Sequence, residues 1–372
     1  MTSHRKNHLA HIKVEGFKSI KQLDLAMRSV NVLIGANGAG KSNFISIFTF
    51  LRYLSEGRLQ HYVERHGFAN TFFHFGTKQT AKIVFDLTVN INGYHVEFKH
   101  GINDDTLVFD HEYCTIEDSS RKFTIKGVRG ESGLLPDGEA DSIGVRNFTR
   151  DYLQQCKVYH FHDTGPAAGF KQAQPVCDNT FLAMDARNIG PFLKRIQDES
   201  PQNYREIVRT IQVVAPFFHD FFLQPQGAEG SKKILLRWLH KHHDTPFSAN
   251  QLSDGMARFI CLTTLFLQPE HLRPETTIID EPELGLHPVA LEVLADMIKL
   301  TAAKAAKNQV ICSTQSIAFA NHFEPEDCIV ADQEKGVSVF RRLEREDLED
   351  WLDEYGVGDL WDKNLVGGRP EW

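Results

Sequence analysis

The sequence predicts an α/β protein built on a parallel core sheet, with an antiparallel β-lobe and a helical insertion. Two short hydrophobic runs, at 30–34 and 276–280, have the near-continuous apolar character of buried parallel strands. Residues 81–114 contain three alternating segments separated by the turn sequences NING and INDD, which indicates an antiparallel meander. Residues 185–222 have helical periodicity broken by prolines.

The other elements follow from the same patterns in chain order. The opening segment HLAHIKVEGFKSI alternates and predicts a strand that turns at Gly16. The stretch 115–150 is polar and Gly-rich, and it predicts a loop region. The sequence further predicts strands within 156–163, 231–244 and 308–316, a loop at 164–180, and helices at 252–268 and 288–306.

Composition limits the function classes. The chain has 372 residues, 41% of them hydrophobic, and a net charge of −8, so it can bury a sizeable core but cannot coat nucleic acid with its whole surface. Any contact with nucleic acid requires a local patch. One group of residues offers such a patch, although a solvated loop is the favoured interpretation: Arg121, Lys122, Lys126 and Arg129.

Cysteine usage and apolar runs bear on the compartment. The six cysteines are scattered without a C-x-x-C pair, so neither a disulfide framework nor a zinc site is expected. Cys261 and Cys312 lie in apolar runs and are predicted to be buried. The N-terminus has no apolar signal region and no run of 18 apolar residues occurs, so we expect a cytoplasmic protein without a membrane span.

The segment GANGAGKS at 35–42 matches G-x-x-x-x-G-K-[ST], with the strand sequence VNVLI before it and a helical stretch after it. Glycines at these positions let backbone N–H groups turn toward phosphate oxygens, and the following helix N-terminus adds positive potential. Lys41 is expected to reach the β- and γ-phosphates, and Ser42 to bind Mg²⁺. The predicted ATP-binding residues are Asn37, Gly38, Ala39, Gly40, Lys41, Ser42 and Asn43.

A pair of carboxylates ends the run TTIIDE. Asp280, at the end of the predicted strand, is expected to hold Mg²⁺ directly or through water. Glu281 would then polarise the attacking water as general base. A strand that merely ends in solvated acids is the alternative, and the phosphate-binding loop elsewhere in the chain favours the functional interpretation.

The order of these motifs, with QLSDGMARF between them, resembles the ABC-type ATPases, and within them the RecF/SMC/OLD-like branch of soluble ATPases. The segments that carry the resemblance are VEGFKSI, GANGAGKSN, QLSDGMARF, DEPELGLHP, STQS and LWDKNLVGGRPEW. They lie in both ends of the chain, and 115–235 is only loosely diagnostic. The resemblance implies a nucleotide-binding head with segments 1–114 and 236–372 as its two halves and 115–235 inserted, without long coiled-coil arms because heptads are absent.

The resemblance also implies roles for individual residues. Ser253 and Gly255, in the signature LSDG, would complete the nucleotide site of a second copy of the chain, and Glu283–His287 would touch that copy. The alternative is that LSDG only caps the following helix. Gln315 occupies the switch position where transporter-type members carry His, and it can sense a γ-phosphate by hydrogen bonding but cannot become charged.

Several further residues keep alternative interpretations. The glutamine expected between the two lobes is Gln79, with His74 as the alternative. Phe17, Lys18 and Ser19 could flank the base or ribose, although Phe17 could equally belong to the core. The histidine pairs and clusters HFH (160–162) and HKHH (240–243) suggest metal ligands but lack partners at ligand spacing.

The function expected from the resemblance is an ATPase that dimerises around ATP and Mg²⁺, with assembly beyond a dimer left open. It would act as a switch that controls an effector protein encoded nearby or a nucleic-acid process, in DNA repair or anti-phage defence. The nucleotide-binding subunit of an ABC transporter and a scaffold that binds ATP without hydrolysis are the alternatives, and Glu281 argues against the scaffold. No nuclease domain is expected, because too little sequence follows Gln315.

Overall fold

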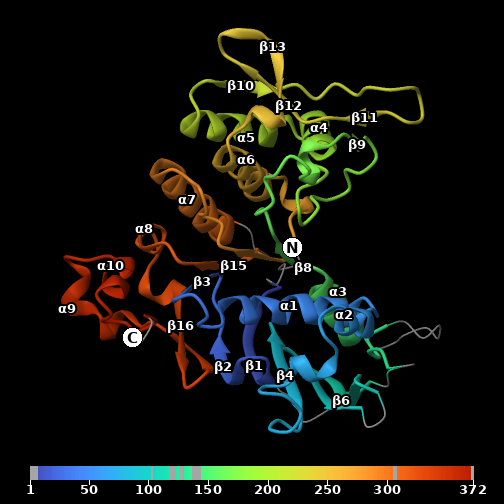
Figure 1. The fold of residues 1–372 in the computed structure, drawn as a ribbon, viewed down its shortest axis with the longest axis vertical. Coiled ribbons are helices and arrows are strands. Elements are labelled where there is room, and N and C mark those ends of the chain that lie inside the picture. Colours follow the sequence, from blue (N-terminus) through green and yellow to red (C-terminus); the bar gives the residue numbers. More distant parts are fainter. Residues whose placement is uncertain are drawn as a thin grey trace, which may run out of the picture. The chain divides into compact units, whose positions relative to one another are not determined.

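The computed structural model describes residues 7–101, 104–116, 122–125, 127, 130–135, 144–304 and 308–369, and it confirms the α/β class (Figure 1). The chain packs as two compact units. The first unit comprises 1–158, 275–278 and 306–372, and the second comprises 159–274 and 279–305. The three segments predicted from the sequence, 1–114, 115–235 and 236–372, do not coincide with these two units, and this division of the chain stays a prediction.

A six-stranded core sheet has the order β17-β16-β3-β15-β14-β8. At its centre, β3 (Val30–Ile34) pairs in parallel with β15 (Gln309–Thr314) and β16 (Cys328–Glu334), which confirms the predicted parallel core. All residues of β3 and β15 are buried, which agrees with the mostly apolar sequence VNVLI of β3 and the apolar centre of β15. The remaining strands are β17 (Val337–Arg342), an antiparallel edge, β14 (Thr276–Asp280) and β8 (Cys156–Tyr159).

The second sheet of the first unit is antiparallel, with the order β2-β1-β4-β5-β6-β7. Its strands β4, β5 and β6 pair consecutively, so the predicted meander is confirmed. The first strand runs through Gly16 to Phe17, and the chain turns at Lys18 and Ser19 instead of at Gly16. The bounds are β1 Leu9–Phe17, β2 Ile20–Ala26, β4 Ile83–Val89, β5 Asn92–His100, β6 Leu107–Ile116 and β7 Lys122–Thr124.

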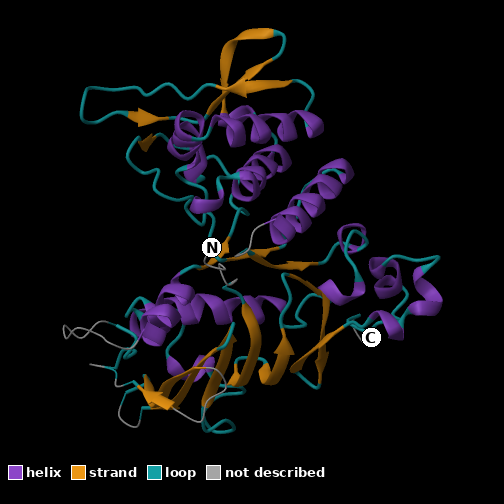
Figure 2. Cartoon of the chain, turned by 180° about the vertical axis from the view of Figure 1, so that it is seen from behind, coloured by secondary structure: helices purple, strands orange, loops and turns teal. Residues whose placement is uncertain are grey.

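Helix α1 (Lys41–Ser55) lies along the antiparallel sheet, as Figures 1 and 2 show, and shares its core. The Phe50 ring packs 5.5 Å from the Phe17 ring and 5.2 Å from the Phe85 ring, measured between centroids. Phe17 is fully buried, so it belongs to the core and not to a base-binding surface. Many of the phenylalanines serve this aromatic core.

Two predicted segments differ from the structure. The region expected to be a loop contains α3 (Gly144–Gln154), which buries Tyr152 and Leu153 and contacts α1. Most of α3 is polar and exposed, and its apolar stripe is narrow. The stripe becomes a buried face only because it packs against α1. The expected helical region ends at α5, and β10 (Phe218–Phe221) follows Pro216 and pairs with β12 instead.

The second unit contains a helical layer and short antiparallel strands. Its longest helix in the described residues, α7, has 17 residues, so the described chain has no long coiled-coil arm. The helices are α4 Ile189–Glu199, α5 Pro201–Val214, α6 Asp254–Leu267 and α7 Pro288–Lys304; the strands are β9 Gln174–Pro175, β10 Phe218–Phe221, β11 Lys233–Ile234, β12 Arg237–His240 and β13 His243–Ser248.

The C-terminal part of the first unit is a small helical cluster. Helix α10 (Val357–Asp362) packs against α8 (Ile317–Ala320), as Figure 1 shows. A Cβ on Gly358 would lie 2.1 Å from the carbonyl oxygen of Ile317, so the two backbones are in direct contact. The other helices of this unit are α2 Leu59–Arg65 and α9 Glu349–Leu352.

Side-chain chemistry agrees with the composition. All six cysteines are free, and Cys261 and Cys312 are buried as predicted. Of the helices in the described ranges, none combines the length and apolar character that crossing a bilayer requires.

Candidate functional site

The predicted phosphate-binding loop leaves the end of β3 and leads directly into α1. Gly40 precedes the helix with φ 106°, a left-handed conformation, and a Cβ there would lie 2.1 Å from Ser338 Oγ. Only glycine satisfies both conditions. No side chain caps the N-terminus of α1. The N-cap residue of this helix is thus a glycine, which has no side chain to place at the positive end.

Lys41 is held against the loop that precedes it. Its side chain is buried, and Nζ donates hydrogen bonds to the carbonyl oxygens of Gly35 (2.6 Å) and Ala36 (2.9 Å). A buried ammonium group is stabilised only by such acceptors or by a counter-ion. The loop therefore keeps a positive charge at its centre, where an anion can replace the carbonyl groups.

A network of hydroxyl groups supports the rear of the loop. Asn43 Nδ2 and Ser338 Oγ each donate a hydrogen bond of 2.7 Å to Ser19 Oγ. The neighbouring Lys18 donates from Nζ to Ser46 Oγ (2.9 Å) and lies above the Phe17 ring. Asn43 and Ser19, both predicted at the nucleotide, thus contact each other, and they tie α1 to the turn between β1 and β2.

Gln315 leaves the core sheet at the same edge as the loop. In the parallel pairing of β15 with β3, Thr314 is opposite Ile34, so Gln315 and Gly35 are the next residues of adjacent strands. A cavity of about 310 Å³ lies there. It is lined by Gly35, Ala36, Asn37, Gln315, Ile317, Trp361, Asp362, Gly368 and Arg369. The structure thus brings together the predicted residues Asn37 and Gln315.

The predicted carboxylates lie where β14 ends. Asp280 is the last residue of that strand, and Glu281 follows with φ 45°, in the left-handed region that a non-glycine residue rarely adopts. The segment continues as tight turns, with Leu284 N donating to Glu281 O and Leu286 N to Glu283 O. An unusual backbone conformation at an acidic residue is typical of a functional position.

The signature turn is exposed and begins α6. Ser253 is its N-cap, and its Oγ accepts a hydrogen bond from Met256 N at 3.3 Å. A Cβ on Gly255 would lie 2.2 Å from Gly285 O, so this glycine allows α6 to contact the turn that follows β14. The capping role considered as the alternative for LSDG is therefore present in the single chain.

Arg258 connects the functional segments of the second unit, and the sequence patterns did not identify it. Its guanidinium group donates to Phe161 O (3.0 Å), to His162 O (3.3 Å) and to Leu284 O. One arginine of α6 thus holds both the segment after β8 and the segment after β14. Its signal in the sequence is only its place three residues after Gly255.

His160, which the sequence suggested only as a possible metal ligand of the HFH motif, lies near the predicted carboxylates. It follows β8, and β8 is the neighbour of β14 in the core sheet. Desolvation by the surrounding protein lowers the pKa of His160, the Asp280 carboxylate opposes this shift, and His162 adds to it. The imidazole therefore lies within the electrostatic influence of the predicted metal ligand Asp280 and favours its neutral form.

The remaining predicted residues have structural contacts. His74 is buried, with Nδ1 2.8 Å from Lys18 O, whereas Gln79 is exposed. Of the proposed basic patch, Arg121, Lys126 and Arg129 lie outside the described residues. Lys122 is exposed, and its Nζ lies 4.2 Å from the centre of the Tyr113 ring.

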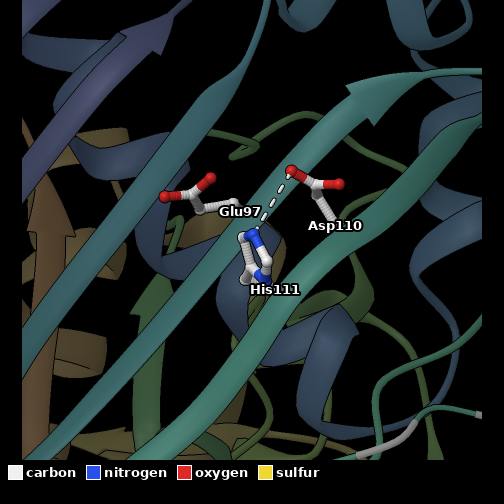
Figure 3. A group of neighbouring side chains, drawn as sticks. All are labelled: Glu97, Asp110 and His111. Carbon is white, nitrogen blue, oxygen red and sulfur yellow. Dashed lines mark ion pairs between the residues drawn. The ribbon is translucent and has the colours of Figure 1, made fainter.

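A cluster of possible metal ligands lies on the antiparallel sheet, where Figure 3 shows Glu97 on β5 and Asp110 and His111 on β6. Each carboxylate already has a lysine partner: Lys82 lies 3.2 Å from Glu97, and Lys99 lies 2.8 Å from Asp110. The hydrogen bond from Lys99 lowers the pKa of Asp110. The cluster is thus a charge-balanced sheet surface, and it carries no metal assignment.

The histidine motifs lack the ligand sets that a metal needs. Within the part of the chain that the structure describes, neither HFH nor HKHH belongs to a group of three ligand-type side chains close enough to share an ion. His240 instead stacks on Phe217, with ring centroids 5.7 Å apart. His240 therefore packs with an aromatic neighbour.

Comparison with known proteins identifies the fold and the family. The chain is similar to a crystal structure of an SMC head bound to the C-winged helix domain of ScpA, with 17% identity, a TM-score of 0.55, and 91% of this chain and 99% of that chain covered. It is also similar to an SMC head domain with an extended coiled coil bound to the C-terminal domain of ScpA, from Pyrococcus furiosus, with 14% identity, a TM-score of 0.53, and coverage of 93% and 99%.

At these identities the likeness shows the fold alone, which is the P-loop ATPase fold of SMC heads. A search among proteins of curated function found no match. Residues 30–321 match the family profile described as "AAA domain, putative AbiEii toxin, Type IV TA system". This match spans most of the chain and contains the phosphate-binding loop, the signature and the switch glutamine. The chain therefore belongs to this AAA family and has the P-loop ATPase fold of SMC heads.

Proposed function

We propose that this protein binds and hydrolyses ATP, and that two copies close around the nucleotide to form a switch. The observation that carries the proposal is the shared sheet edge of the loop and Gln315, where Asn37 and Gln315 line one cavity and Lys41 donates to the loop carbonyl of Gly35. Loop amides, a lysine and an amide side chain at one edge suit a triphosphate better than any other ligand.

The chain's own oxygen and nitrogen groups define the chemistry. The Ser42 hydroxyl and the Asp280 carboxylate are hard oxygen ligands, which fit Mg²⁺. When bound, Mg²⁺ would neutralise phosphate charge. Lys41 would exchange its bonds to Gly35 O and Ala36 O for phosphate oxygens, and Gln315 would hydrogen-bond at the γ-phosphate. Glu281 would accept the proton of the attacking water.

The dimer part of the proposal depends on the signature turn. Ser253 is exposed at the N-terminus of α6, and while its Oγ accepts from Met256 N, its O–H could donate to an approaching phosphate. Gly255 and Arg258 hold that turn against the segment after Glu281. Closure on ATP and hydrolysis by Glu281 would then be coupled through one packed unit.

The output of the switch is proposed to be control of a partner effector. The matched family is described as a putative toxin of a type IV toxin–antitoxin system, and the SMC heads of similar fold are bound to a partner protein. Both support action through another macromolecule, and we propose defence or DNA repair as its setting. Gln315 and the EPELGLHP continuation favour this proposal over a transporter subunit.

The test is ATP turnover together with light-scattering mass for wild type and Glu281→Gln. Loss of a general base lowers turnover by about 10²–10⁴-fold. We expect the variant to accumulate as an ATP-bound dimer, while wild type turns over slowly. Glu292→Gln, an exposed acid in α7, is the matched control and should behave as wild type. Normal hydrolysis by a monomeric Glu281→Gln variant would overturn both the base and the closed dimer.

A further inference from the structure

The C-terminal segment from α10 to Arg369 forms one wall of the cavity beside the phosphate-binding loop. Trp361, Asp362, Gly368 and Arg369 line this wall, opposite residues of the loop and Gln315. All of these residues belong to the first unit. The cavity is therefore closed by a segment more than three hundred positions away from the loop in the sequence.

Backbone hydrogen bonds fix this segment to the loop. Ala36 N, within the loop, donates to Gly368 O at 2.9 Å, and Trp361 Nε1 donates to the same oxygen at 3.2 Å. Gly368 N donates to Asp332 Oδ2 at 3.0 Å. Because consecutive Cα atoms are about 3.8 Å apart, Arg369 starts from a position set by the loop itself.

Two of the lining residues carry charge, and they face each other. Arg369 forms an ion pair with Asp362, and the two side chains are 47% and 52% exposed. An exposed pair of this kind contributes little to stability, so it is easily exchanged. The planar guanidinium group matches phosphate oxygens through two parallel hydrogen bonds, and a triphosphate carries more charge than one carboxylate.

We propose that Arg369 is a phosphate-binding residue of the nucleotide site, which leaves Asp362 and contacts the terminal phosphate of a nucleoside triphosphate held by the loop. The inference rests on the proposed ATP binding. Its position beside Asn37 and Gln315 makes the terminal phosphate the target, since Gln315 is the residue proposed to sense that group. Asp362 holds the arginine when no triphosphate is present and competes with the phosphate for it.

The two partners of the ion pair should therefore act with opposite signs. Arg369→Gln removes a charge-assisted contact to the phosphate and should raise the Kd for a non-cleavable ATP analogue by about tenfold. Asp362→Asn removes the competing carboxylate and should lower that Kd. A purely structural ion pair predicts the same direction for both variants, because each one breaks the same bond.

The experiment measures Kd for the non-cleavable ATP analogue and for ADP with the full chain by calorimetry. The variants are Arg369→Gln, Arg369→Lys, Asp362→Asn and Lys41→Ala. Arg345→Gln is the matched control, because Arg345 forms an exposed pair with Glu324 at 3.1 Å in the same unit, away from the cavity lining. We expect the ADP affinity of the Arg369 variants to stay within about twofold of wild type. Arg369→Lys should keep part of the affinity for the ATP analogue, and the melting temperatures should be unchanged.

The outcomes separate the two proposals. If wild type binds the analogue, Lys41→Ala does not, and Arg369→Gln equals Arg345→Gln, the role of Arg369 is wrong while ATP binding stands. If wild type binds no triphosphate, or Lys41→Ala binds as well as wild type, the proposed function fails and this inference fails with it. If Arg369→Gln folds poorly, Asp362→Asn alone decides the inference. A lower Kd of Asp362→Asn for the ATP analogue would support it, and an unchanged or raised Kd would overturn it.

Discussion

Two helices of this protein begin after a Gly- or Ser-containing turn, and their N-termini differ in one respect. Helix α1 starts after Gly40 without any side-chain cap, whereas Ser253 caps α6 through its bond to Met256 N. Both ends carry the partial positive charge of a helix N-terminus. The N-cap residue of α1 thus offers no side-chain acceptor, whereas that of α6 accepts one hydrogen bond from its own helix.

The different N-caps of α1 and α6 indicate when each turn would bind a phosphate. An uncapped N-terminus with a buried lysine is a preformed anion site, and ligand binding there costs little rearrangement. The capping serine still has its O–H donor, which can bond to a phosphate from a second molecule while Oγ accepts from Met256 N. The loop is therefore expected to bind ATP in the monomer, and the signature turn to act only when another copy supplies the phosphate.

The largest expected effect is that of Lys41→Ala. Removing the ammonium group takes away at least one charge-assisted contact to phosphate, so ATP affinity should fall about 10–100-fold. Calorimetry on the monomer measures this loss. Lys78→Ala, an exposed lysine in the same unit, is the control. If Ser253→Ala weakened ATP binding by the monomer as much as Lys41→Ala, the proposal that only the N-terminus of α1 binds ATP in the monomer would be wrong.

A smaller effect is expected at Gly255, where the close contact involves the protein itself. A Cβ at this position would lie 2.2 Å from Gly285 O, so Gly255→Ala forces α6 away from the turn after β14. Overpacking of this kind costs about 1–3 kcal/mol in the free energy of unfolding. Urea unfolding measures it, and ATP affinity of the monomer should be unchanged.

The control for this variant is Gly144→Ala at the start of α3, where an added Cβ would meet no atom within 4 Å. That change should be neutral or slightly stabilising, by about 0.5–1 kcal/mol. Equal unfolding free energies for the two variants would contradict the contact between Gly255 and Gly285.

The parts of the site that are contiguous in sequence could be predicted. The strand, loop and helix around Lys41, and the helix that starts at the signature, follow from local patterns and were found where expected. The parallel core could also be predicted, because β3 and β14 have the mostly apolar sequences VNVLI and TTIID of buried strands.

The missed parts depend on contacts between distant segments. Arg258 binds carbonyl groups more than ninety positions upstream, and His160 matters because β8 lies beside β14. Arg369 reaches the loop only through the hydrogen bond between Gly368 and Ala36. No periodicity encodes such neighbours. The α3 helix was missed for a related reason, since its apolar face is meaningful only against α1.

The smallest expected effect separates the two roles of Ser253. Ser253→Ala removes the cap of α6 and should lower the free energy of unfolding by about 0.5–2 kcal/mol, whereas Ser253→Asn keeps a capping side chain. Both variants lack the hydroxyl group offered to a second copy. If that group completes the site in the dimer, Ser253→Asn should unfold like wild type and still hydrolyse ATP more slowly. Unfolding in urea and phosphate release at fixed protein concentration measure the two quantities. Wild-type turnover by Ser253→Asn would assign the serine to helix capping alone, and the two helix ends would then differ in function as well as in structure.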